Sequence, residues 1–109
     1  MIKVDRNIWS VHDPDEVLTY DRENFDASIL KFLGDIHPRE DLLSFENKIT
    51  NYIVDFGYYG CELALDGTWV VYVVNGNINE PWEQPVERHE TDAFLEGIDN
   101  VDIMLQKYT

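Results

Sequence analysis

The spacing of apolar and polar positions changes along the chain, and these changes predict its secondary structure. Between Glu23 and Leu33 apolar residues recur at intervals of three and four, as on a helix with one buried face. A second helix is expected from Pro38, a residue that favours the first helical turn, to about Phe56. Its apolar stripe comprises Leu42, Phe45, Ile49, Tyr52 and Phe56.

After Gly57 the spacing becomes that of β-strands. The segment "CELAL" alternates over residues 61–65, and the Asp66-Gly67 pair that follows is typical of a tight hairpin turn. The run "TWVVYVV", residues 68–74, is β-branched and aromatic, as expected of a strand buried on both faces. Two antiparallel strands are therefore predicted, and residues 8–11 are compatible with a further short edge strand.

The C-terminal third combines a loop with a final helix. Pro81 and Pro85 interrupt regular structure in "NGNINEPWEQPVER", and an amphipathic pattern then runs from about Thr91, whose hydroxyl can cap a helix, to about Lys107. The resulting order is α-α-β-β-α, with or without the extra N-terminal strand. It predicts one small α+β domain over residues 1–109, in which helices pack on a short antiparallel sheet in two layers.

The composition adds a strong charge signal. Asp and Glu total 22 against 8 Lys and Arg, so the formal net charge is −14, and the acids are spread along the whole chain. A uniformly negative surface repels nucleic acid and anionic lipid and accelerates encounter with basic surfaces. The alternative interpretation is that the acidity serves only solubility or adaptation to a salt-rich habitat.

Motifs for catalysis or metal binding are missing from the sequence. There is no glycine-rich phosphate loop, no nucleophile elbow and no paired-cysteine zinc spacing, and His12, His37 and His89 lie far apart. The acidic segment "HDPDE" at residues 12–16 lacks the glycine and the terminal glutamate of a calcium loop. Cys61 begins a predicted core strand and is interpreted as an inert thiol. We therefore expect neither an enzyme nor a cofactor.

The expected compartment is the cytosol of a bacterial host. A single cysteine cannot form an internal disulfide, and the first residues have neither the basic region nor the apolar run of a secretory signal. The longest apolar run, Trp69 to Val74, is far shorter than the roughly 20 residues that span a bilayer. No membrane role is predicted.

Aromatic residues beside carboxylates are one set of candidate binding residues. Trp82 lies between Glu80 and Glu83 in the proline-bounded loop, and Tyr58 and Tyr59 lie between glycines in "FGYYG". Such groups suit arginine and lysine through cation–π contacts and charge-assisted hydrogen bonds. The alternative is that these rings only cover the edge of the core.

The final helix supplies a second set of candidates. Successive acids in it are separated by a rise of about 4.5 to 6 Å, similar in scale to the ~3.4 Å advance of phosphates along one DNA strand. A cleft that holds a phosphate backbone could hold this row of carboxylates instead. The row comprises Asp92, Glu96, Asp99 and Asp102.

In charge, size and composition, but in no sequence motif, the chain is similar to phage-borne inhibitors of nucleic-acid enzymes. The hypothesis is an acidic DNA mimic of the anti-CRISPR or anti-restriction type that binds a basic, nucleic-acid-binding surface of a bacterial defence enzyme. The alternatives are an immunity protein that neutralises a basic nuclease toxin, and an acidic regulatory protein without enzymatic activity. Direct binding of nucleic acid is not expected. The protein is predicted to be a monomer or homodimer, since residues 69–74 could form an edge strand shared between two copies.

Overall fold

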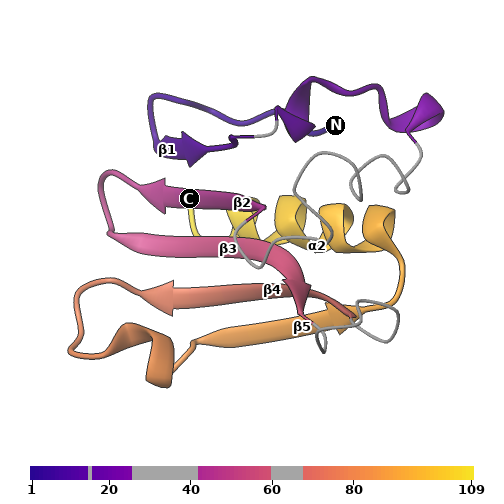
Figure 1. The fold of residues 1–109 in the computed structure, drawn as a ribbon. Helices are drawn as coiled ribbons and strands as arrows, with labels where there is room; N and C mark the ends of the chain where they lie inside the picture. The colour runs from indigo at the N-terminus through magenta and orange to yellow at the C-terminus, as the bar shows by residue number, and fades with distance from the viewer. Residues whose placement is uncertain (15, 26–41, 60–67) are drawn as a thin grey trace.

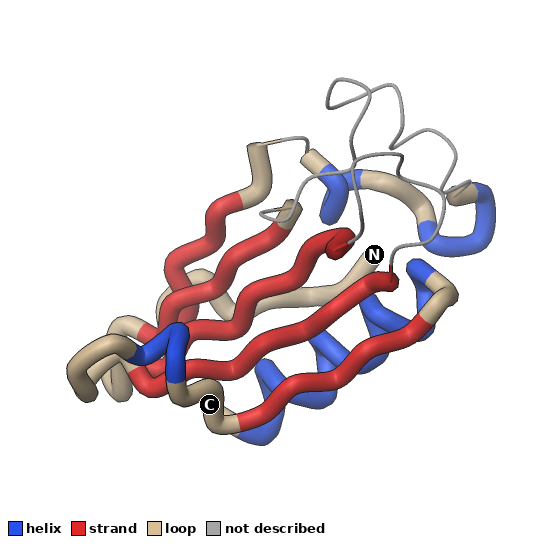
Figure 2. The backbone as a smooth tube through the Cα atoms, turned by 60° about the horizontal axis from the view of Figure 1, so that its bottom comes forward, coloured by secondary structure: helices blue, strands red, loops and turns tan. Residues whose placement is uncertain are grey.

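The structure is a computed structural model that describes residues 1–14, 16–25, 42–59 and 68–109. These residues form a five-stranded antiparallel sheet in which each strand pairs with its neighbours in sequence, in the order β1-β2-β3-β4-β5 (Figure 1). A helix, α2, follows the last strand and lies along one face of the sheet (Figure 2). The elements are β1 (Trp9–His12), β2 (Leu43–Asn47), β3 (Tyr52–Tyr59), β4 (Thr68–Asn75), β5 (Glu87–Thr91) and α2 (Phe94–Lys107).

The predicted order α-α-β-β-α is wrong, because the described order is β-β-β-β-β-α. The main error is the helix expected from Pro38 to Phe56, whose described part consists of strands β2 and β3. Its three-and-four spacing is accidental: Ile49, which should lie in the middle of the apolar stripe, is 77% exposed in the turn between the strands. The side chain of Asn47 fixes this turn by accepting hydrogen bonds from the backbone N–H groups of Ile49 and Thr50.

Other predicted elements have mixed outcomes. The strand over residues 68–74 is confirmed as β4, the final helix is confirmed as α2, and the N-terminal edge strand is found one residue further on, as β1. Strand β5 occupies residues that were expected to be loop and helix start. Only a 3₁₀ turn, Arg22–Asn24, is found at the start of the helix predicted from Glu23. Phe25, which follows this turn, has an extended backbone. Residues 26–33 of that helix, the strand over residues 61–65 and its Asp66-Gly67 turn lie outside the described residues.

The main core lies between α2 and the sheet. Alternate residues of the central strands, among them Phe45, Val54 and Phe56, face the helix and are fully buried. Gly97 lets α2 approach this layer closely, since a Cβ atom at this position would lie 2.6 Å from Cε1 of the Phe56 ring. Helix and sheet are therefore packed at a distance that a larger residue would disturb.

Strand β4 is buried on both faces, as its continuous apolar sequence predicts. Val71 and Val73 face α2, Val70 and Val74 face the other way, and all four are fully buried. Because β4 pairs with β3 on one side and with β5 on the other, it is an interior strand. The expectation that residues 69–74 could be an edge shared between two copies is therefore wrong. Among the described helices, none is long and apolar enough to cross a membrane.

Candidate binding surfaces

The carboxylates of α2 do not form a uniform row. Asp92, just before the helix, and Glu96, in its first turn, are exposed, whereas Asp102 is half-buried. Asp99 accepts two hydrogen bonds from the Arg22 guanidinium, at 2.7 and 3.0 Å, and this ion pair raises the pKa of Arg22. The charge available to a partner is therefore reduced in the middle of the row.

The predicted cap of the final helix is wrong, because the N-cap residue is Ala93, whose side chain cannot accept a hydrogen bond. Thr91 ends β5, and its hydroxyl accepts a hydrogen bond from the N–H of Ala93 and donates one to the Glu96 carboxylate, 2.9 Å away. The helix begins at Phe94. Thr91 thus orients Glu96 at the helix start.

A different surface is formed where two connections meet at one end of the sheet, at the left of Figure 1. The β2–β3 turn, residues 48–51, and the β4–β5 loop, residues 76–86, lie side by side there. Three hydrogen bonds join them: Gly76 N to Asn51 O (2.9 Å), Asn51 Nδ2 to Asn77 Oδ1 (2.8 Å) and Asn77 Nδ2 to Thr50 O (2.8 Å).

These two connections carry an unusual concentration of exposed apolar side chains. The described chain exposes five large hydrophobic residues, and all but Ile103 on α2 belong to the turn and the loop. We call the four residues the loop-end patch: Ile49 (77% exposed), Ile78 (38%), Trp82 (53%) and Val86 (45%). Apolar exposure concentrated in one place is typical of an interaction surface.

Two carboxylates flank Trp82 in sequence. Pro81–Glu83 form a 3₁₀ turn, η4, and Glu80 precedes it in the left-handed conformation with φ of 53°. Glu80 and Glu83 are exposed, and neither forms an ion pair with another described residue. The predicted grouping of Glu80, Trp82 and Glu83 is thus a short, exposed turn.

Tyr58 and Tyr59 lie at the other end of β3, roughly 20 Å from the loop-end patch at about 3.3 Å per residue. They point to opposite faces of the sheet, as neighbours in a strand must. Tyr58 packs edge-on against Trp69, with ring centroids 5.1 Å apart, and Tyr59 packs edge-on against Tyr72 at 5.5 Å. The two tyrosines do not share a surface with Trp82.

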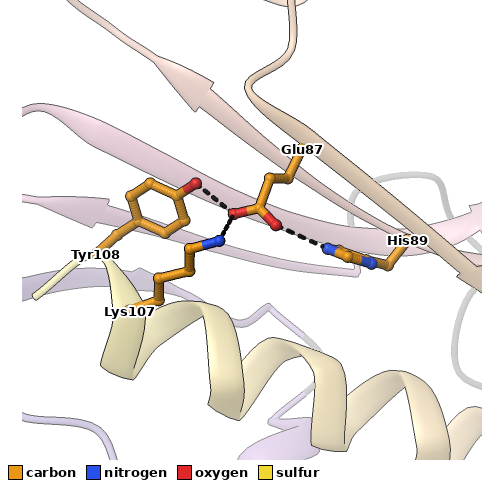
Figure 3. Close-up of polar contacts among 4 residues, drawn as sticks. All are labelled: Glu87, His89, Lys107 and Tyr108. Carbon is orange, nitrogen blue, oxygen red and sulfur yellow. Dashed lines mark hydrogen bonds and ion pairs between the residues drawn. The ribbon is translucent and has the colours of Figure 1, made fainter.

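Sequence reasoning missed a cluster around Glu87, which joins β5 to the C-terminal end of α2 (Figure 3). Glu87 accepts a hydrogen bond from Lys107 Nζ at 2.8 Å and another from the Tyr108 hydroxyl, and His89 Nε2 lies 3.1 Å away. The bonds from Lys107 and Tyr108 lower the pKa of Glu87 from 4.5 to about 2. Burial, followed by the bond to Glu87, raises the pKa of Tyr108 to about 12.

Tyr108 of the Glu87 cluster attaches the C-terminal end of α2 to the sheet. The Tyr108 ring packs against Tyr52 of β3 with centroids 5.1 Å apart, and its backbone oxygen accepts a hydrogen bond from Asn47 Nδ2 at 2.9 Å. Tyr108 therefore ties the end of α2 to three strands. The only sequence signal was Glu87 and His89 alternating along one face of "ERHET".

The acidic segment near the N-terminus serves the local fold. Both carboxylate oxygens of Asp13 accept backbone hydrogen bonds, from Val17 at 2.8 Å and Leu18 at 2.9 Å. A cavity of about 350 Å³ lies beside this turn, with mixed apolar and charged walls. Within residues 1–14, 16–25, 42–59 and 68–109, no group of three His, Cys, Asp or Glu side chains could hold a metal ion.

Comparison of the chain with family models, with curated proteins and with solved structures gave no match.

Proposed function

We propose that the protein is an acidic inhibitor that occupies a basic, nucleic-acid-binding surface of another protein. The proposed target is a bacterial defence enzyme of the CRISPR or restriction type, so the inhibitor would be phage-encoded and act in the host cytosol. The observation that carries the proposal is an excess of 22 acidic over 8 basic residues. The acids are spread along the whole chain rather than confined to a tail.

The placement of the cations strengthens this argument. Arg22, Arg88 and Lys107 each lie within 2.8 Å of a carboxylate oxygen, on Asp99, Glu90 and Glu87 respectively. Cations held in this way are not available to attract an anionic partner, and most of the remaining surface charge is negative. The electrostatic field around the protein would be negative, like that of the phosphate backbone which a basic cleft normally binds.

The mechanism that follows is competition with nucleic acid. Long-range attraction would bring the acidic domain to the basic surface quickly at low salt, and close ion pairs would then hold it there. Because the binding depends on charge, both nucleic acid and added salt should displace it.

Affinity capture with DNA competition tests the proposal. The protein is immobilised, and the heparin-binding proteins of a bacterial lysate are passed over it at low salt. We expect a small set of proteins to be retained and then eluted by short duplex DNA at constant salt. Retention that duplex DNA does not reverse, or no retention, would contradict the proposal. If the eluted protein is a nuclease toxin, the immunity-protein alternative is favoured over a defence enzyme.

Asp92 and Glu96 allow a sharper version of this test. The double variant Asp92→Asn, Glu96→Gln removes two exposed charges and leaves the Arg22–Asp99 ion pair intact. If α2 faces the basic surface, the variant should elute at lower salt than the original protein. A matched control is Glu16→Gln with Glu46→Gln, which removes two exposed charges elsewhere. Equal shifts for both variants would mean that only total charge matters.

A further inference from the structure

We propose that the loop-end patch is the docking surface for a protein segment that presents arginine beside an apolar side chain. This inference rests on the proposed function, which requires a basic partner. It adds the place of close contact and the chemistry of the partner's contact residues.

Large apolar side chains are exposed on the β2–β3 turn and on the β4–β5 loop. Trp82 and Ile49 are more than half exposed, although a fold that buries Trp9 and Trp69 almost completely has room for rings in its core. Exposed tryptophan is costly in water and is enriched among the residues that contribute most to protein–protein binding. Ile78 and Val86 are further exposed apolar residues of the same loop. The area is suited to an apolar side chain of a partner.

Hydrogen bonds hold the turn and the loop that carry the patch in place before a partner binds. The hydrogen bonds between the β2–β3 turn and the β4–β5 loop involve the backbone of Asn51 and Gly76 and the side chain of Asn77. Near the other end of the loop, Val86 N donates to Val73 O at 2.7 Å. A surface fixed in this way loses little conformational entropy when a partner binds.

The turn that carries Trp82 is negatively charged. Glu80 and Glu83 border Trp82 and have no ion pair among the described residues. An aromatic face next to carboxylates binds a guanidinium group through a cation–π contact together with charge-assisted hydrogen bonds.

The same molecule already contains an example of this chemistry. The Arg88 guanidinium carbon lies 5.6 Å from the centre of the Tyr72 ring, and its Nη1 lies 2.7 Å from the Glu90 carboxylate. In that example the aromatic ring and the carboxylate hold an arginine of the chain itself. Trp82, with Glu80 and Glu83 near it in the sequence, offers an aromatic ring and carboxylates to an arginine from outside, although tryptophan lacks the hydroxyl by which Tyr72 also binds Arg88.

Other occupants fit the patch less well. Nucleic acid and anionic lipid are repelled by the net charge of −14 and by Glu80 and Glu83, which lie near Trp82 in the sequence. A second copy of the chain would bring the same net charge, with few cations to compensate it. A basic protein segment satisfies both the apolar and the acidic parts of the surface.

Binding of labelled peptides, followed by fluorescence anisotropy at low salt, tests the inference. One peptide repeats arginine, leucine and serine, and the other has the same number of arginines with serine in place of leucine. The arginine–leucine peptide should bind more tightly, and Trp82→Ala should weaken it by about tenfold or more. The matched control is Ile103→Ala, an equally exposed apolar position on α2, which should leave binding unchanged.

Each contrary outcome has a distinct meaning. Equal binding of the two peptides, unaffected by Trp82→Ala but abolished by salt, would refute the docking surface and leave the charge-based function standing. If neither peptide binds at low salt, the docking surface is refuted, and the proposed function is then decided by the capture experiment with DNA competition alone. If Trp82→Ala and Ile103→Ala weaken binding of the arginine–leucine peptide equally, the docking surface is also refuted, because the effect would then be independent of position.

Discussion

Replacing Glu87 by glutamine should destabilise the fold at neutral pH and have little effect at low pH. In the structure this carboxylate receives hydrogen bonds from Lys107 and from the Tyr108 hydroxyl, and its side chain is only 20% exposed. The amide keeps the shape of the side chain but cannot form the ion pair with Lys107. The contacts that hold the end of α2 against β5 should therefore weaken.

The magnitude follows from the pKa of Glu87, which is lowered from 4.5 to about 2 in the folded state. Since one pKa unit corresponds to about 1.4 kcal/mol, the shift sets an upper limit of roughly 3 kcal/mol. Lys107 is 55% exposed, so solvent screens the ion pair, and we expect a loss of about 1 to 2 kcal/mol at pH 7. Because the folded pKa is the lower one, this stabilisation is complete above about pH 5 and is lost as the pH falls from 4.5 toward 2.

The measurement is the free energy of unfolding in urea for the original protein and Glu87→Gln at several pH values. Taking the difference removes the general effect of carboxylate protonation, which both proteins share. Glu90→Gln is the control, because Glu90 pairs with Arg88 at an exposed site and should change stability by less than about 1 kcal/mol. If Glu87→Gln lowers the free energy of unfolding by the same amount at pH 7 and at pH 3, the charge of Glu87 is not the source of the loss.

Two further substitutions test the packing and the loop. Gly97→Ala should lower the free energy of unfolding by about 1 to 2 kcal/mol, because its Cβ would meet the Phe56 ring at 2.6 Å, whereas in a Phe56→Leu background it should be neutral or stabilising. A stabilising effect in the original protein, measured by urea unfolding, would show that α2 is not packed so closely. Glu80→Gly should raise the melting temperature or leave it unchanged, since glycine relieves the positive φ, whereas Glu83→Gly should lower it. A clear loss of stability for Glu80→Gly would mean that the left-handed backbone there is not strained.

The sequence predicts the parts of this fold whose pattern fits one structure only. Residues 68–74 are too β-branched and aromatic for anything but a buried strand, and the stripe of α2 extends over four turns. Residues 42–56 fit two structures, because spacings of three and four occur by chance among residues that also alternate. In the structure a turn between β2 and β3 interrupts the helical spacing, and its hydrogen bonds to the Asn47 side chain are not revealed by periodicity.

The candidate surfaces were predictable to a similar degree. Trp82 and its two glutamates were identified from the proline-bounded loop and are exposed in the structure. Ile49 could not be added to them, because the predicted helix placed it in the core. The Glu87 cluster joins residues about 20 positions apart, and no local pattern indicates that a strand and a helix end will meet there.

The position of β4 has a consequence for the solubility of the protein. A strand as rich in valine as this one readily recruits similar strands when its edge is free, and continued recruitment leads to fibrils. On one side, that edge is covered only by β5, five residues whose sequence is mostly charged. A change that detaches β5 would uncover the most aggregation-prone segment described here, so resistance to aggregation depends on the short polar strand more than on the apolar strand that it covers.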